Sequence, residues 1–393
     1  MCRAVAIWYP RPMHDFEFHN PTRMILGKGA IAQLEKLVPA NARVLVTSGG
    51  GSIKKNGVRD QVLAALKGRT VSEFGGIEPN PEYDTLLKAV ERVQREKTDF
   101  LLAVGGGSVL DGTKFIAAAA RYPAGKDPWD FLVDHGKSVR EALPLGCVMT
   151  LPATGSEGNP TAVISRRERT EKFFFGASPC FPLFAILDPT ITFSLPRRQV
   201  VNGIVDAYVH VIEQYATTVS DAPLQDRQAE AILSTLVESA EAILADPPRY
   251  AARATLMWCA TQALNTLIGC GVDQDWATHM IGHELTALYG LDHGVTLAII
   301  LPGALRERLS QKRAKLTQYG KRIFAVDSAE AAIERTEDFF RGLGMKTRLS
   351  EYGIDAKAAA AEVERRFTSR GFTAGEKGEV DGKLAARIVL SRA

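Results

Sequence analysis

The first half of the chain alternates short apolar runs with stretches of helical periodicity. Strands are predicted at residues 43–47 (RVLVT), 71–74, 100–104 (FLLAV), 146–150 and 184–187, with helices between them at residues 58–67, 83–97 and 109–120. Strands that alternate with helices are joined by right-handed crossovers, which place the strands parallel to one another. We therefore expect an α/β domain of the nucleotide-binding, Rossmann-like kind.

After about residue 195 helical periodicity dominates, and no strand is predicted. Helices are expected at residues 198–217, 225–245, 250–267, 276–289, 294–308 and 328–343. A chain of 393 residues also exceeds the roughly 250–300 residues that one hydrophobic core supports. We expect an α/β domain over residues 1–195 and an all-helical domain over residues 196–393. A cleft between two such domains is a common place for a small-molecule site.

Composition and charge narrow the class of protein. The chain is 46% hydrophobic and 24% charged with a net charge of +3, which is typical of a globular protein and gives no reason to expect a nucleic-acid or membrane partner. The five cysteines are scattered and form no C-x-x-C pair, which fits a reducing cytoplasm. The longest uncharged stretch, residues 254–272, carries several Thr, Asn and Gln residues, so a buried core helix is favoured over a membrane span.

Two glycine-rich turns follow predicted strands, and both are candidates for binding phosphate. The first is Ser48-Gly49-Gly50-Gly51-Ser52, and the second is Gly105-Gly106-Gly107-Ser108, which leads directly into a helix. Glycine allows the backbone to approach a phosphate, and the N–H groups at a helix start point at it. A tight strand-to-helix turn is the alternative for the second segment. Neither turn matches the Rossmann G-x-G-x-x-G pattern, and the chain has no Walker A sequence.

A third polar segment follows the strand predicted at residues 146–150. It contains Thr150, Thr154, Ser156, Glu157 and Asn159 within ten residues. Short hydrogen-bonding side chains at the end of a strand favour a loop that lines a ligand site, although a solvated loop has the same composition.

Histidine and aspartate are concentrated in the helical half. Asp206 and His210 are four residues apart, as are His279 and His283, and His293 follows shortly afterwards. A spacing of four places two side chains on one helix face, from which both can reach one ion. Imidazole and carboxylate ligands suit Zn²⁺ or Fe²⁺. Hydrogen-bonded core histidines are the alternative, but ionisable groups are rarely buried together without a partner.

Six motifs taken together resemble the iron-containing (group III) alcohol dehydrogenase family, and in particular its NADPH-dependent aldehyde reductase and butanol dehydrogenase branch. They are GGGSIKKNG at residues 49–57, FGGIEPNP at 74–81, GGGSVLDGTKFIA at 105–117, TLPATGSE at 150–157, GIVDAYVHVIEQY at 203–215 and DWATHMIGHELTALYGLDHG at 275–294. The resemblance extends from about residue 21 to the C-terminal region. Residues 1–17 do not match the usual start of the family and are expected to be an extension.

The resemblance implies a fold, a reaction and a set of site residues. The fold is a dehydroquinate-synthase-like fold, and the reaction is the reversible, metal-dependent reduction of an aldehyde by NADPH. The resemblance also implies one divalent metal ion, zinc or iron, and a homodimer. The implied metal ligands are Asp206, His210, His279 and His293, and His283 would face the substrate as the catalytic residue. The implied cofactor contacts are Gly49, Gly50, Gly51, Ser52, Asn80, Gly106, Gly107, Ser108, Asp111, Thr150, Thr154, Asn159 and Lys172.

Two features of the sequence bear on the substrate and the cofactor. The segments at residues 203–215 and 275–294 contain no Arg or Lys, which favours a neutral aldehyde over the anionic substrate of a polyol-phosphate dehydrogenase or a lyase of the same fold. The turn at residues 48–52 contains no carboxylate to bind the 2′-hydroxyl of NAD, and Lys54 and Lys55 follow it. NADPH is therefore expected over NADH, although two lysines at a helix start are often merely solvated.

Overall fold

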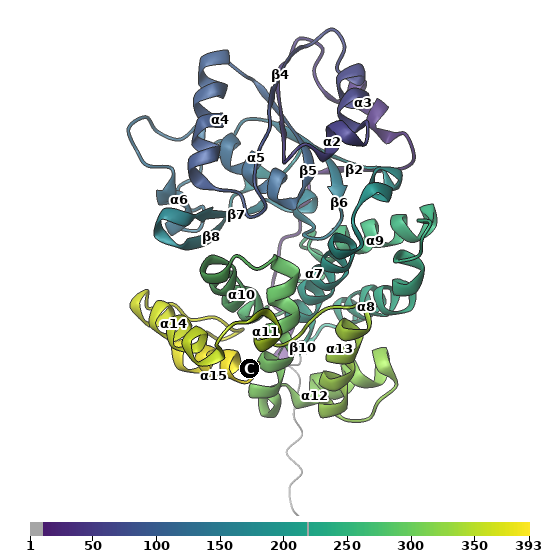
Figure 1. The fold of residues 1–393 in the computed structure, drawn as a ribbon, viewed down its shortest axis with the longest axis vertical. Coiled ribbons are helices and arrows are strands. Elements are labelled where there is room, and N and C mark those ends of the chain that lie inside the picture. Colours follow the sequence, from purple (N-terminus) through teal and green to yellow (C-terminus); the bar gives the residue numbers. More distant parts are fainter. Residues whose placement is uncertain (1–10, 218–219) are drawn as a thin grey trace, which may run out of the picture.

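A six-stranded sheet forms the core of the N-terminal half. The computed structural model describes residues 11–217 and 220–393. The strands lie in the order β2-β9-β6-β5-β3-β4, and every neighbouring pair is parallel. Figure 1 shows this half, with β4, β5 and β6, above the helices of the C-terminal half. Their bounds are Arg23–Leu26 (β2), Arg43–Ser48 (β3), Thr70–Phe74 (β4), Phe100–Gly106 (β5), Leu145–Leu151 (β6) and Phe184–Leu187 (β9). The prediction of a parallel α/β sheet is confirmed.

Helices cover both faces of this sheet because alternate strand residues point to opposite sides. Leu45 and Leu101 belong to a core that includes helix residues Leu86 and Leu110, whereas Val44 belongs to a second core on the other face. The helices of this half are Leu34–Leu37 (α1), Ser52–Lys55 (α2), Val58–Ala65 (α3), Tyr83–Glu96 (α4), Gly107–Ala119 (α5) and Trp129–Val133 (α6).

An antiparallel hairpin lies beside the sheet and was not predicted. It consists of β7 (Thr161–Arg166) and β8 (Glu171–Gly176). Five of the six residues at positions 166–171 are charged and separate two short, mostly apolar runs, residues 161–165 and 172–176. Neither run is long enough to predict a β-strand by itself. The hairpin contacts α10 of the helical half, which gives it a place at the boundary between the two halves.

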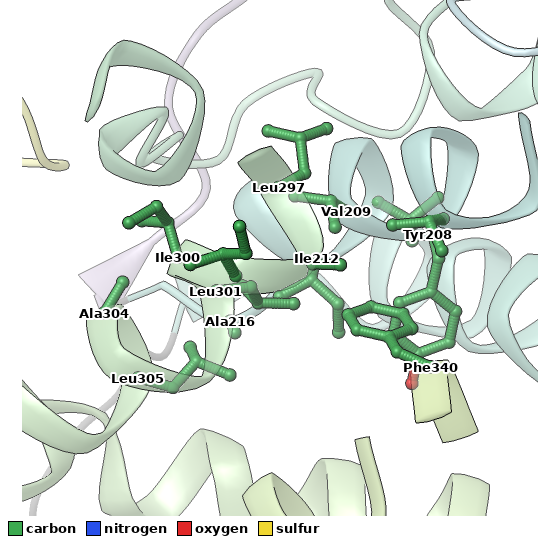
Figure 2. Close-up of a cluster of buried hydrophobic side chains, with 14 of the residues drawn as sticks. Tyr208, Val209, Ile212, Ala216, Leu297, Ile300, Leu301, Ala304, Leu305 and Phe340 are labelled. Atoms are coloured by element: carbon green, nitrogen blue, oxygen red, sulfur yellow. The ribbon is translucent and has the colours of Figure 1, made fainter. Parts of the chain in front are cut away.

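The C-terminal half is helical, as predicted, and its central helix is α7. The helices are Arg197–Tyr215 (α7), Pro223–Ile243 (α8), Tyr250–Ala263 (α9), Ala277–Tyr289 (α10), His293–Glu307 (α11), Leu309–Tyr319 (α12), Ala329–Gly342 (α13), Ala356–Ser369 (α14) and Gly382–Leu390 (α15). Figure 2 shows Tyr208, Val209 and Ile212 of α7 packed near Leu297 and Leu301 of α11 and Phe340 of α13. This buried contact fixes the relative positions of helices far apart in the sequence.

Two short segments correct the expectation that this half contains no strand. β10 (Ser220–Asp221) pairs in parallel with β1 (Arg11–Pro12), so residues 11–12 lie against the helical half. The backbone N–H of His14 also donates to the carbonyl of Gly271 at 2.9 Å. Further along, the Asn20 side-chain amide donates to the carbonyls of Gly158 and Asn265.

The uncharged stretch at residues 254–272 contains most of α9, whose Leu256, Met257 and Ala260 are fully buried. Its interpretation as a core helix is confirmed for residues 254–263, whereas residues 264–272 form turns and bends after the end of α9. Within the two described ranges of the chain, no helix is long and apolar enough to cross a membrane.

Candidate metal and cofactor site

The glycine-rich turns lie at the carboxyl ends of neighbouring strands. Gly49–Ser52 follows β3, Gly106–Ser108 joins β5 to α5, and Thr150 lies near the end of β6. Ligands of open α/β sheets bind at this edge. Packing also requires glycine within the second turn, because a Cβ on Gly107 would lie 2.5 Å from Oγ1 of Thr154. The turn therefore serves the packing of the loop as well as any phosphate.

Three helices bring together the four side chains predicted as metal ligands. Asp206 and His210 lie on α7, His279 lies on α10, and His293 begins α11. One ligand atom from each residue lies within 4.8 Å of the others. Asp206 Oδ1 lies 3.5 Å from His210 Nδ1, 3.5 Å from His293 Nε2 and 3.9 Å from His279 Nε2. Tetrahedral ligands about 2.1 Å from an ion are about 3.4 Å apart, so the cluster has the size of a metal site.

The polar atoms of this cluster fit a divalent cation. Asp206 Oδ1, His210 Nδ1 and His279 Nε2 are buried, and none has a hydrogen-bond partner among the residues that the structure describes. Burial raises the pKa of Asp206 to about 8 and, with the Lys172 ammonium, lowers the pKa of His279 to about 3. Burial likewise lowers the pKa of His210 and His293. Three neutral imidazoles and one buried aspartate side chain form a donor set suited to Zn²⁺ or Fe²⁺.

A cavity of about 520 Å³ joins this cluster to the edge of the sheet. The three histidines of α10 and α11 line it together with His210. Burial lowers the pKa of His283, so its imidazole is neutral at pH 7. Lys172 of β8 also lines the cavity, and it is the only Lys or Arg among the described lining residues.

Some predicted cofactor residues line the cavity and others lie outside it. The lining includes Asn80, Ser108, Asp111, Thr154, Asn159 and Lys172, but not Gly49–Ser52, Gly106, Gly107 or Thr150. Lys172 Nζ donates to Asn80 Oδ1 at 2.8 Å, and the Ser108 hydroxyl accepts from the Asn80 N–H at 3.3 Å. These contacts connect the hairpin to the start of α5.

The polar groups of Asp111 and Asn159 are already engaged inside the protein. The Asp111 carboxylate accepts from the Ser156 hydroxyl and the Val163 N–H. The Asn159 side chain donates to the carbonyls of Gly155 and Leu264 and accepts from the Thr161 N–H. Both side chains thus hold the loop in place, and a cofactor contact from either one remains a prediction.

The sequence reasoning missed several residues of the site. Phe174, Trp276, Met280 and Phe372 supply much of the apolar lining, and no spacing in the sequence identifies them. Glu213 was also missed, although it follows Asp206 by seven residues and His210 by three, which places all three on one face of α7. Its carboxylate contacts His279 directly.

Comparison with known proteins gives matches over nearly the whole chain. The model for iron-containing alcohol dehydrogenase matches residues 21–189, and the model for the C-terminal part of the Fe-containing alcohol dehydrogenase family matches residues 200–374. The chain is 54% identical over 383 residues to a protein of Escherichia coli (strain K12) named NADPH-dependent aldehyde reductase YqhD, covering 96% of this chain and 99% of that protein. It is 43% identical to NADP-dependent alcohol dehydrogenase 3 of Entamoeba histolytica, covering 96% and 98% of the two chains.

Solved structures agree with this assignment. The crystal structure of E. coli K-12 YqhD superposes with a TM-score of 0.96 at 52% identity and covers 98% of this chain and all of that one. The crystal structure of NADH-dependent butanol dehydrogenase A from Thermotoga maritima gives a TM-score of 0.90 at 33% identity, with 98% and 99% of the two chains covered. The protein belongs to the iron-containing alcohol dehydrogenase family.

Proposed function

We propose that this protein is a metal-dependent aldehyde reductase that uses NADPH and also works in reverse as an alcohol dehydrogenase. The observation that carries the proposal is one cavity with two kinds of lining residue. His210, His279 and His293 of the ligand set line it, and it is also lined by Asn80, Ser108 and Lys172; the fourth ligand, Asp206, has a ligand atom within 4.8 Å of the three histidines. Relatives at 54% and 43% identity that are named for NADPH or NADP support the choice of cofactor.

Two groups of residues have different roles in the proposed site: one group binds the metal ion and the other binds the cofactor. Asp206, His210, His279 and His293 would hold the ion, while Lys172, Asn80 and the GGGS turns would hold the nicotinamide cofactor. When bound, the metal ion polarises the aldehyde carbonyl and NADPH supplies the hydride. His283 faces the same cavity and would hydrogen-bond the substrate oxygen. The apolar side chains around it exclude water from the reacting groups.

The lining of the cavity favours a neutral, moderately apolar substrate. Phe174, Trp276, Met280 and Phe372 contribute apolar surface, and Lys172 is already bonded to Asn80. A phosphorylated substrate would need several cationic side chains, which this lining does not supply among its described residues. A polyol-phosphate dehydrogenase is therefore less compatible with the site than an aldehyde reductase.

We further propose that the division between the α/β and helical domains lies at residues 195/196, immediately before α7, and that the enzyme is a cytoplasmic homodimer. The resemblance to the family supports the dimer. The four described cysteines are buried free thiols, which is consistent with a reducing compartment. Sedimentation of the purified protein tests the oligomeric state.

The experiment that tests the function is a scan of aldehydes with the metal-loaded protein. We expect oxidation of NADPH with neutral short-chain and medium-chain aldehydes, and its loss when a chelator removes the metal. NADH in place of NADPH, and a polyol phosphate in place of the aldehyde, are the controls. If none of the aldehydes tested leads the metal-loaded protein to oxidise NADPH, the proposed function is wrong.

A further inference from the structure

Glu213 lies behind the metal cluster and is not one of its ligands. It follows His210 by three residues on α7, and its side chain is only 2% exposed. Its carboxylate contacts the Nδ1 atom of His279, the ring nitrogen opposite to the one that faces Asp206. The two nitrogens of this ring therefore have different partners: Glu213 on one side and the cluster on the other.

The same carboxylate binds the start of α10. Its Oε1 accepts from the Thr278 N–H at 2.5 Å, and its Oε2 accepts from the His279 N–H at 3.2 Å. The residue at the N-cap position, Trp276, makes no side-chain capping bond. Glu213 thus satisfies two of the free N–H groups that every helix start presents. When Glu213 is ionised, both of its oxygens accept N–H groups, and the third contact is then donation from His279 Nδ1.

The proton on Nδ1 determines what the other nitrogen can do. A neutral imidazole carries one proton, and if this proton is on Nδ1, the lone pair of Nε2 is free to bind a metal ion. The buried His279 Nε2 has no hydrogen-bond partner within the described part of the chain, and it points at Asp206. A carboxylate behind a ligating histidine fixes both the tautomer and the ring orientation.

We propose that Glu213 is a positioning residue for the metal site: it holds His279 in the Nδ1–H tautomer and couples the ligand to the N-terminus of α10. This inference rests on the proposed ligand set. Glu213→Gln distinguishes positioning from simple capping. In this variant the amide oxygen can still accept from the Thr278 N–H, and the amide NH₂ group then lies against His279 Nδ1. Because the NH₂ group donates to Nδ1, it favours the Nε2–H tautomer of His279. That tautomer cannot bind a metal ion through Nε2.

The experiment measures the affinity of the protein for Zn²⁺ by competition with a chelator, without substrate or cofactor. We expect Glu213→Gln to bind Zn²⁺ about 10–100-fold more weakly than the wild type. Asp381→Ala is the matched control, because Asp381 caps α15 by accepting from the Leu384 N–H and lies on no ligand-bearing helix. It should lower the melting temperature and leave the affinity for Zn²⁺ unchanged.

Two further measurements separate the possible failures. His279→Ala tests the ligand set: if the wild type binds no Zn²⁺, or His279→Ala binds it normally, the ligand set is wrong and this inference falls with it. If both tests of the ligand set succeed but Glu213→Gln binds as tightly as the wild type, only the role of Glu213 is overturned. If Glu213→Gln does not fold, ¹⁵N NMR of the histidine-labelled wild-type apoprotein decides. An Nδ1–H tautomer at His279 supports the inference, and an Nε2–H tautomer contradicts it.

Discussion

Beyond the ligands, His283 is the residue that we propose to act on the substrate oxygen in the cavity. It lies one turn after His279 on α10, and its ring centroid is 5.5 Å from that of His293. We expect His283→Ala to retain the metal and to lower kcat by about 10²–10⁴-fold, because a group that hydrogen-bonds or relays a proton to the reacting oxygen is lost. Turnover, metal content and melting temperature are measured together, with the exposed His19→Ala as control. A lower melting temperature with an unchanged kcat would instead indicate a packed core histidine.

Gly50 is the residue of the first turn that best tests cofactor choice. A Cβ at Gly50 meets no atom within 4 Å, whereas Gly51 has a φ of +96° and would be strained by any side chain. We expect the wild type to prefer NADPH, and Gly50→Asp to reverse or abolish this preference by placing a like charge against the 2′-phosphate. The measurement is kcat/KM with both cofactors, and Gly50→Asn is the neutral control of equal size. A wild-type preference for NADH contradicts the interpretation.

At the scale of elements, Glu337 of α13 connects α11 to the C-terminal end of the chain. Its Oε1 accepts from Arg392 at 2.6 Å and from the Thr347 hydroxyl at 3.0 Å, and its Oε2 accepts from Arg306 of α11 at 3.1 Å. Burial by itself would raise the pKa of Glu337, but the hydrogen bond and charge of Arg392 outweigh it and lower the pKa to about 2. The carboxylate therefore stabilises the end of the chain against α11 and α13.

This lowered pKa predicts how the stability depends on pH. Because the folded pKa lies below the unfolded value of about 4.3, the stabilisation is complete above about pH 5 and is lost as the pH falls toward 2. We expect Glu337→Gln to lower the free energy of unfolding by about 2–3 kcal/mol at pH 7 and by less at pH 3.5. Urea unfolding at both pH values checks this, with the exposed Glu334→Gln on the same helix as control. A difference that grows on acidification would contradict the assignment.

At the scale of the whole molecule, Arg366 of α14 joins the helical half to the hairpin of the other half. Its guanidinium donates to Glu284 of α10 and to the carbonyl of Thr170, in the turn between β7 and β8. Arg370 donates to the same Glu284 carboxylate at 2.5 Å and lies over the ring of Phe173. The cavity has residues of both halves in its lining, and the Arg366 contact joins these two halves.

We expect Arg366→Met to destabilise the protein by about 3 kcal/mol, since it leaves a buried carboxylate with one cationic partner fewer. It should also raise KM for NADPH and aldehyde more than it lowers kcat, because the helical half and the β7–β8 hairpin lose a contact that fixes their relative position. Steady-state kinetics and chemical unfolding check both effects. Arg365→Met is the control, because Arg365 is 63% exposed and pairs only with Glu362 among the residues described. Unchanged KM values would show that other contacts fix this relative position.

The sequence by itself determined the fold class, five of the six strands of the parallel sheet and the pairing of candidate ligands along each helix. These features are local. Alternating apolar runs identify the strands of the parallel sheet, and a spacing of four places Asp206 and His210 on one helix face whatever the helix packs against. The six motifs also identified the family, because each couples a residue type to a fixed position in a turn or helix.

Only the tertiary structure decided which distant residues meet. His279 and His293 reach Asp206 because α7, α10 and α11 pack together through buried apolar faces, and no periodicity specifies that packing. The same packing places Glu213 behind His279 and joins Arg366 to Thr170, 196 residues away. It also engages Asp111 and Asn159 in internal hydrogen bonds. Local sequence patterns depend on backbone periodicity, whereas long-range partners depend on side-chain packing between elements.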